Sequence, residues 1–279
     1  MEQDSIKSIL EKVEVWNPGD VSYEVLSGGL TNNNFTVRAN GTTYVLRIPG
    51  QGSEVMIDRD HELFNSKAAA KAGVSPEVIC SVKPENALVL EFIEGEVMHP
   101  ETVAQSNDKI ADMGKSLGQL HSRAAFQPET YVFNMIPKYV SMCKDVKAFL
   151  PYDFDWMLSV MDEIEKAMER NKPELAACHN DLLSENFIHD PSGKMWIIDW
   201  EYGGMNDPFF DLGDVCVEHP LTPEQEELFL KAYCGEVDQP RLCRMRLHKL
   251  TADVWWGMWG MIQDKISRLD FDFYTYGIR

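Results

Sequence analysis

The sequence predicts an α+β protein of two lobes, a smaller lobe built on a sheet and a larger, mostly helical one. Five short runs of strand-forming residues precede residue 95, with one helix-forming stretch between the third and fourth runs. From residue 101 to 170 apolar residues recur at helical spacing, and one hairpin signal follows near residue 190. We therefore expect a five-stranded antiparallel sheet with one helix in residues 1–95, and a helical lobe carrying the hairpin in residues 96–279.

The elements of the first lobe follow from local patterns. Apolar residues at helical spacing behind Asp4 predict a short additional helix at the N-terminus, and Asn40-Gly41 between two strand-like runs is a hairpin signal. A later helix-forming stretch ends at Gly73, a typical helix terminator. The expected order is a helix over 4–13, strands over 23–26, 34–38 and 43–48, a helix over 58–72, and strands over 77–81 and 87–92.

The second lobe begins with helices. One apolar stripe over 110–121 includes His121, which we expect to be a buried, hydrogen-bonded residue rather than a catalyst. Further helices are expected over 155–168 and 223–234, the latter ending at Gly235.

Composition limits the class of partner. The 279 residues are 44% hydrophobic and 25% charged, which is ordinary for a folded globular chain. Their formal net charge of −19 repels polyanions, so we expect neither nucleic acid nor a membrane surface as a partner. A cationic small molecule is favoured instead, and the oligomeric state stays open.

Cysteine usage and the N-terminus indicate a compartment. Six cysteines are scattered without a C-x-x-C pair, which argues against a zinc site and fits reduced thiols. No apolar run reaches the roughly 18 residues of a membrane span, and the first residues lack the form of a signal peptide. We expect a soluble, cytoplasmic protein.

The most informative stretch covers residues 178–212. Two apolar runs flank a Pro- and Gly-containing turn at 190–193, which predicts a β-hairpin. Because an antiparallel hairpin returns to the end where it began, Asn186 before the first strand and Asp199 after the second should meet there. Asp181 lies five residues before Asn186 in the same entering loop.

These three side chains suit two chemical roles. Asn186 and Asp199 offer hard oxygen ligands that could hold Mg²⁺ and leave coordination sites for phosphate and water. Asp181 is then free to accept a proton from a hydroxyl, as phosphoryl transfer requires. Each residue alone would more often be a turn residue, but their order and spacing favour catalysis. Asp211, further along the same stretch, is expected to anchor the backbone of this loop.

The order and spacing of these residues behind His179 resemble the catalytic loop and metal-binding aspartate of protein kinases. Asn180 stands where protein kinases usually have Arg, and Trp200-Glu201 stands where they have Phe-Gly. With these departures, HND and IDWEY resemble the small-molecule branch of that fold, the choline/ethanolamine kinases and aminoglycoside phosphotransferases. The resemblance implies a two-lobed, protein-kinase-like fold that uses ATP and Mg²⁺.

A glycine-rich loop between the first two strands is the candidate phosphate cradle. Gly28 and Gly29 allow close approach of the backbone, and Ser27, Thr31 and Asn32 can add hydrogen-bond donors. The alternative is an ordinary hairpin turn. Its position well upstream of the catalytic hairpin favours phosphate binding.

The third strand carries the candidate cation for the α and β phosphates. It has no lysine, so the candidate is Arg47, whose guanidinium can hold a phosphate and a carboxylate together. Choline kinases resemble this sequence in having Arg there; the alternative is an ordinary surface arginine. Glu62 on the following helix is the expected acidic partner, with Asp58 and Asp60 as competitors.

The segment after the fifth strand should connect the lobes. Glu91, Phe92 and Ile93 would offer backbone N–H and C=O groups to adenine, with the lobe boundary near residue 95.

Aromatic residues near the C-terminus indicate the phosphate acceptor. Trp256 and Trp259 share a helix face, and indole faces attract cations. The alternative is a packed helix seam, which the acidic character of the chain and Glu218 make less favoured. WWGMWGMIQDKIS followed by FDFYTY resembles the C-terminal signature of choline/ethanolamine kinases. That resemblance implies a choline pocket walled by Trp256, Trp259 and Tyr276, with Glu218 near the ammonium group.

The function that the resemblance implies is ATP-dependent phosphorylation of the choline hydroxyl to phosphocholine, with Asp181 as base. Ethanolamine, aminoglycoside or thiamine kinases are the nearest alternatives. A catalytically inactive ligand-binding module is a more distant one, because such a protein would be expected to have lost Asp181 or Asp199.

Overall fold

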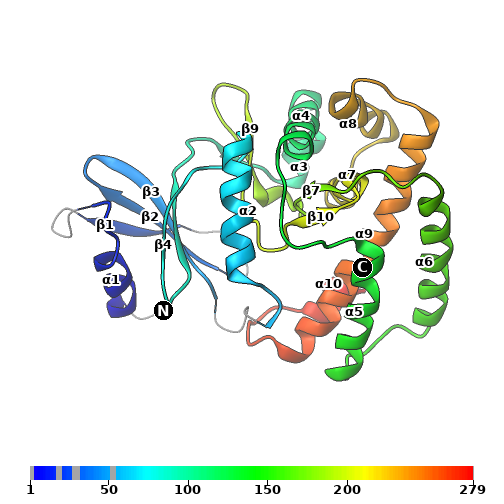
Figure 1. The fold of residues 1–279 in the computed structure, drawn as a ribbon, viewed down its shortest axis with the longest axis horizontal. Helices are drawn as coiled ribbons and strands as arrows, with labels where there is room; N and C mark the ends of the chain where they lie inside the picture. The colour runs from blue at the N-terminus through cyan, green and yellow to red at the C-terminus, as the bar shows by residue number, and fades with distance from the viewer. Residues whose placement is uncertain (1–2, 17–20, 27–31, 51–54, 279) are drawn as a thin grey trace.

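The computed structural model describes residues 3–16, 21–26, 32–50 and 55–278. A β-sheet occupies one end of the molecule and most of the helices the other, with α2 between them (Figure 1). This is the two-part α+β arrangement that the sequence predicts.

The five-stranded sheet has the order β1-β2-β3-β5-β4, and all neighbouring strands are antiparallel. The hairpin between β2 and β3 turns at Asn40 (φ 52°) and Gly41 (φ 75°), as the Asn-Gly signal predicts. The strands are β1 (Ser22–Leu26), β2 (Asn33–Ala39), β3 (Thr42–Ile48), β4 (Val78–Val82) and β5 (Ala87–Glu91).

Two helices accompany the sheet. The amphipathic helix α1 (Gln3–Glu11) packs Ile6, Ile9 and Leu10 against the apolar face of the sheet. Helix α2 (Arg59–Ala72) begins behind Asp58, whose carboxylate accepts hydrogen bonds from the N–H groups of Asp60 and His61.

Helix α2 also connects the sheet to the helical part. It ends at Gly73, which adopts the left-handed conformation (φ 82°) expected from the sequence. Asn65 in its middle donates to the carbonyl oxygens of Gln127 (2.7 Å) and Gly203 (2.8 Å). The helix that follows β3 is therefore fixed to loops of the second half of the chain.

The chain leaves the five-stranded sheet after β5 and enters a second sheet. Strand β6 (Glu96–Val97) pairs with β8 (Phe187–His189), which pairs with β9 (Met195–Ile197). A Cβ atom at Gly95 would lie 2.7 Å from the carbonyl oxygen of His189, so the close approach requires glycine. We propose residue 95 as the boundary between the N-terminal and C-terminal lobes.

Helices make up most of the C-terminal lobe, and two apolar clusters form its core. Among the described helices, none combines the length and the apolar character needed to cross a membrane. The two remaining strands, β7 (Ala176–Cys178) and β10 (Gly204–Asn206), pair with each other. The helices are α3 (Pro100–Ala104), α4 (Asn107–Arg123), α5 (Val132–Asp145), α6 (Phe154–Met168), α7 (Pro208–Glu218), α8 (Pro223–Cys234), α9 (Gln239–Ile266) and α10 (Phe273–Gly277), with 3₁₀ turns at Glu169–Asn171 and Ser184–Asn186.

Candidate active site

The loop after β7 is held by the buried N-terminal half of α7. The carboxylate of Asp211 accepts hydrogen bonds from the backbone N–H groups of His179 (2.8 Å) and Asn180 (2.8 Å). His121 is 3.0 Å from the same carboxylate through Nε2, and its Nδ1 is 3.0 Å from the hydroxyl of Tyr233. The structure thus confirms Asp211 as the anchor of this loop and His121 as a hydrogen-bonded support, whose side chain is buried although the residue as a whole is partly exposed.

Asn180 shows why the usual arginine can be absent here. The residue is fully buried, and its φ of 69° lies in the left-handed region that asparagine tolerates. Its side-chain amide donates to the carbonyl of Tyr202 (2.8 Å) and to Thr130 Oγ1 (3.1 Å), and its Oδ1 accepts from Asn206 (2.9 Å). An amide that satisfies three internal partners replaces a charged side chain.

The β8–β9 hairpin brings its two ends together as predicted. The N–H of Ile198 donates to the carbonyl of Asn186 (2.9 Å), and the Asn186 amide donates to the carbonyl of Asp181 (2.8 Å). The Nδ1 atom of His179 accepts a hydrogen bond from the N–H of Asp181, so the proton of the neutral ring is on Nε2, which donates to the Ile198 carbonyl (2.8 Å). Burial lowers the pKa of this imidazole. Asp181, Asn186 and the residue before Asp199 therefore share one hydrogen-bonded unit.

Asp199 and Asn186 provide an oxygen donor set that fits a magnesium ion. The Asn186 amide nitrogen is used by the Asp181 carbonyl, so the amide oxygen is the atom available as a ligand. Asp199 has a φ of 72°, a strained conformation found at functional positions, and its side chain is 26% exposed among buried neighbours. Carboxylate and amide oxygens are ligands that Mg²⁺ prefers.

An ion cluster joins the sheet to the catalytic hairpin. Arg47 Nη2 lies 2.5 Å from Asp199 Oδ1, 2.9 Å from Glu201 Oε1 and 3.4 Å from Glu62 Oε1. Arg59 lies 2.6 Å from both Glu62 and Glu201. The Glu62 expected from the sequence is thus one of three carboxylates around Arg47, and it is not the nearest.

The cluster keeps Arg47 charged despite its burial. Burial lowers the pKa of Arg47, but Asp199, Glu201 and Glu62 outweigh it and raise that pKa above its ordinary value. Two arginines against three carboxylates leave one negative charge in excess, which a divalent cation could offset.

The other nucleotide-binding candidates lie around this cluster. Ser27, Gly28, Gly29 and Thr31 fall outside the described residues. Asn32 is described, and its side chain hydrogen-bonds to Glu201, which connects the end of that loop to the cluster.

The connecting segment offers only part of the expected adenine contact. The N–H of Glu91 already donates to the carbonyl of Glu77 (2.9 Å), so of the three residues predicted to contact adenine this one has its N–H in use. On the sheet, Val45 and Leu90 are cross-strand partners on the same face as Arg47, and they form an apolar surface beside it.

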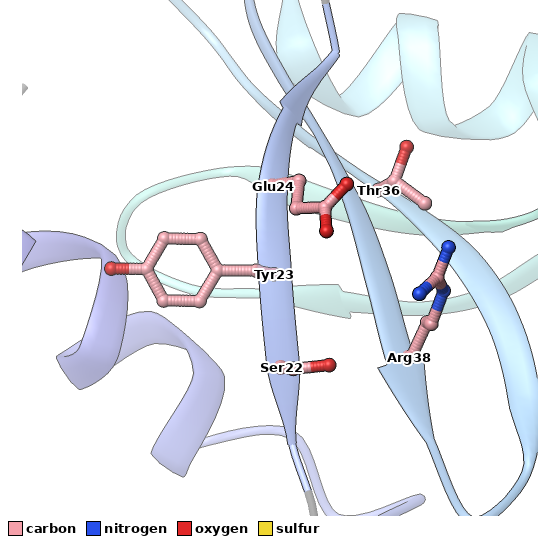
Figure 2. Close-up of a pocket in the computed structure, with 5 residues that line it drawn as sticks. All are labelled: Ser22, Tyr23, Glu24, Thr36 and Arg38. Carbon is pink, nitrogen blue, oxygen red and sulfur yellow. The ribbon is translucent and has the colours of Figure 1, made fainter.

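A shallow pocket lies further along this face of the sheet. Figure 2 shows Glu24, Thr36 and Arg38 on one side of β1 and β2, with the Tyr23 ring directed the other way. Arg38 is four residues along β2 from Asn34, the partner of Arg47, which is roughly 14 Å in a strand. We assign this pocket no part in the candidate active site.

Aromatic side chains from three segments meet beside the catalytic loop. Ring centroids are 5.7 Å apart for Trp256 and Trp259 and 5.8 Å apart for Trp259 and Tyr276. Tyr202 adds a further wall: its ring lies 5.0 Å from Trp256, and its hydroxyl accepts from Trp259 Nε1 (2.7 Å). A Cβ atom at Gly260 would lie 2.8 Å from Gly277 Cα, so glycine permits the contact that brings α10 and Tyr276 against α9.

Electrostatic interactions link Tyr276, one of these aromatic residues, to Asp181. Burial raises the pKa of Tyr276, and Glu218 and Asp181 raise it further. Burial likewise raises the pKa of Asp181 well above its ordinary value, with Asp199 and Glu218 adding to the effect. Asp181 thus lies close enough to the candidate metal ligand Asp199 and to Glu218 for both carboxylates to raise its pKa.

Sequence reasoning missed four residues of this site: Arg59, Glu201, Tyr202 and Asp214. Glu201 and Tyr202 lie two and three residues after Asp199. This short spacing indicated that they belong to the same loop and could take part in the site. Nothing in the spacing indicated Asp214, whose carboxylate accepts from the N–H of Leu182 (2.7 Å).

Comparison with known proteins agrees with this geometry. Residues 23–279 match the family model described as choline/ethanolamine kinase. Protein LicA of Haemophilus influenzae is 28% identical over 249 residues, which cover 85% of this chain and 72% of that protein.

Two solved structures are similar over the whole chain. A choline/ethanolamine kinase family protein from Mesorhizobium loti is 34% identical with a TM-score of 0.86, covering 100% of this chain and 92% of that one. The choline kinase LicA from Streptococcus pneumoniae is 26% identical with a TM-score of 0.80, covering 100% and 96%. The two-lobed, protein-kinase-like fold expected from the sequence is confirmed.

Proposed function

Because the chain belongs to the choline/ethanolamine kinase family, we propose that it transfers the γ-phosphoryl group of ATP to the hydroxyl of choline, giving phosphocholine and ADP. The observation that carries the proposal is the place of Asp181 in one hydrogen-bonded unit with Asn186 and the residue before Asp199, where Asp199 and Glu218 both raise its pKa. A small substrate held by its cationic end near Glu218 would present its hydroxyl end toward Asp181.

In the proposed reaction, Asp181 orients the hydroxyl and accepts its proton as the new oxygen–phosphorus bond forms and the bond to the ADP oxygen breaks. Its raised pKa makes it a stronger base than an exposed aspartate. Asn186 and Asp199 would hold Mg²⁺, which supplies positive charge to the phosphate oxygens. Arg47, fixed by its three carboxylate partners, would contact the α and β phosphates.

Specificity is proposed to come from the aromatic pocket. Trp256, Trp259, Tyr202 and Tyr276 offer ring faces and edges, and a quaternary ammonium group has no N–H to satisfy. Ethanolamine is the second candidate, since its ammonium group could donate hydrogen bonds to Glu218. Steady-state kcat/KM for choline and ethanolamine measured side by side decides between them; a higher value for ethanolamine refutes the choline assignment.

Replacement of Asp181 with Asn tests the catalytic role itself. We expect kcat to fall by roughly a thousandfold, because the base is removed, while ATP affinity stays close to that of the wild type. The matched control is Asp162→Asn, the same change at an exposed position of α6. Turnover by Asp181→Asn at the wild-type rate would exclude the assigned role, and lack of turnover by the wild type with any amino alcohol would exclude the proposed function.

A further inference from the structure

Helix α7 holds the catalytic loop at successive turns. Beyond the contacts of Asp211, Asp214 lies almost one turn later and accepts the N–H of Leu182 (2.7 Å). His219, just past the end of the helix, lies 2.8 Å from the hydroxyl of Ser184 through Nε2. One side of the helix thus contacts the loop on both sides of Asp181.

Asp214 is unusual among these contacts because, in the part of the chain that the structure describes, only one of its two carboxyl oxygens has a partner. The residue is fully buried, and Oδ1 has no hydrogen-bond partner among the described residues. Oδ2 alone accepts the Leu182 N–H. An ionised carboxylate would leave a charged oxygen buried and unpaired, which is costly, whereas a carboxylic acid keeps the acceptor and places a proton on Oδ1.

The groups around Asp214 also favour its uncharged form. The titratable groups that affect it are acidic: Glu218 and Asp211 from its own helix and Asp181 from the catalytic loop, and it in turn affects Tyr276 of α10. Burial raises the pKa of Asp214 well above its ordinary value, and the three acids raise it further.

We propose that Asp214 is a positioning residue for phosphoryl transfer, holding the Leu182 N–H and with it the Asp181 segment of the loop, and that it does so as an uncharged carboxylic acid. Asp211 fixes the backbone before Asp181 and Asp214 fixes the backbone after it, so the base is held from both sides. The kinetic part of this proposal rests on the proposed function, whereas the hydrogen bond does not.

Two substitutions at the same position test the proposal. Asp214→Ala removes the acceptor, and we expect kcat to fall by roughly a hundredfold with little change in KM for either substrate, because the loop and Asp181 shift. Asp214→Asn keeps an oxygen acceptor of the same shape, and we expect it to recover most of the lost kcat. The pH profile of kcat/KM for Asp214→Asn should superimpose on that of the wild type, because no charge is removed.

Each other result overturns a stated part of the proposal. Wild-type kcat in Asp214→Ala would exclude positioning, and an Asp214→Asn variant as slow as Asp214→Ala would mean that the negative charge is needed. If the acidic limb of the kcat/KM profile lies at lower pH in Asp214→Asn than in the wild type, the substitution has removed a negative charge near Asp181. That result would show that the wild-type Asp214 carboxyl is ionised. Asp162→Ala, at an exposed position, is the control for general effects of substitution.

Hydrogen exchange of the Leu182 amide separates this proposal from the proposed function. We expect faster exchange in Asp214→Ala and wild-type protection in Asp214→Asn, with no acceptor substrate present. If the wild type phosphorylates neither choline nor ethanolamine, the proposed function is refuted. The exchange rates of the Leu182 amide still test its hydrogen bond to Asp214. If Asp214→Ala does not fold, Asp214→Asn still tests the proposal. Loss of protection of the Leu182 amide from hydrogen exchange in Asp214→Asn would refute the role of Asp214 as an uncharged acid.

Discussion

Affinity for the cationic substrate should depend on pH through Glu218. Burial raises the pKa of this carboxyl to about 7, and Glu185 and Asp253 add to the effect. Below that pH the group is protonated and gives no charge to an ammonium ion; above it the group is a carboxylate. Affinity for choline is therefore expected to be present at high pH and lost as the pH falls.

The size of the effect follows from the ionised fraction. With a pKa of about 7, about one-tenth of the molecules carry the charge at pH 6 and about nine-tenths at pH 8. If choline binds only the charged form, its Kd should rise about tenfold between pH 8 and pH 6. Bound choline should also lower the pKa of Glu218, so binding near neutral pH should release protons.

The assay is a choline titration followed by tryptophan fluorescence, because Trp256 and Trp259 lie in the proposed pocket. Working without ATP separates binding from the chemistry of Asp181. Glu218→Gln is expected to bind weakly with no pH dependence, and Asp162→Asn, at an exposed position of α6, to keep the wild-type dependence. Equal affinity of the wild type at both pH values, or a pH dependence that persists in Glu218→Gln, would refute the reasoning.

Two further predictions concern the ion cluster and the aromatic pocket. Arg47→Ala should lower the free energy of unfolding by about 3 kcal/mol, because it removes the direct ion-pair partner of Asp199 and leaves Glu201 with Arg59 alone. Urea denaturation measures this, and an unchanged midpoint would contradict it. Trp259→Leu removes an indole face and the hydrogen bond to Tyr202. A loss of about 2 kcal/mol of cation–π attraction should raise the KM for choline about thirtyfold, with the KM for ATP as the internal control; equal changes in both would indicate general damage.

The local half of the site could be predicted from the chain itself. Asn186 and Asp199 flank two short apolar runs joined by a Pro-Gly turn, and a hairpin necessarily brings such residues together. The end of α2 at Gly73 was predicted in the same way, since it depends on the conformation of a few neighbouring residues, whereas Asp58 was expected inside the helix and is its N-cap.

Only the tertiary structure decided how these local units combine. Arg47 meets Asp199 across 152 residues, and the aromatic wall depends on how α9 and α10 pack beside Tyr202. Asp214 could not be recognised from spacing, because its role depends on how α7 packs beneath the catalytic loop and on its complete burial. The sequence by itself determined which chemical groups are present and which near neighbours must meet. Contacts between distant segments, and the burial that shifts the pKa values of Asp181 and Glu218, arise from packing of whole elements, for which residue spacing carries no signal.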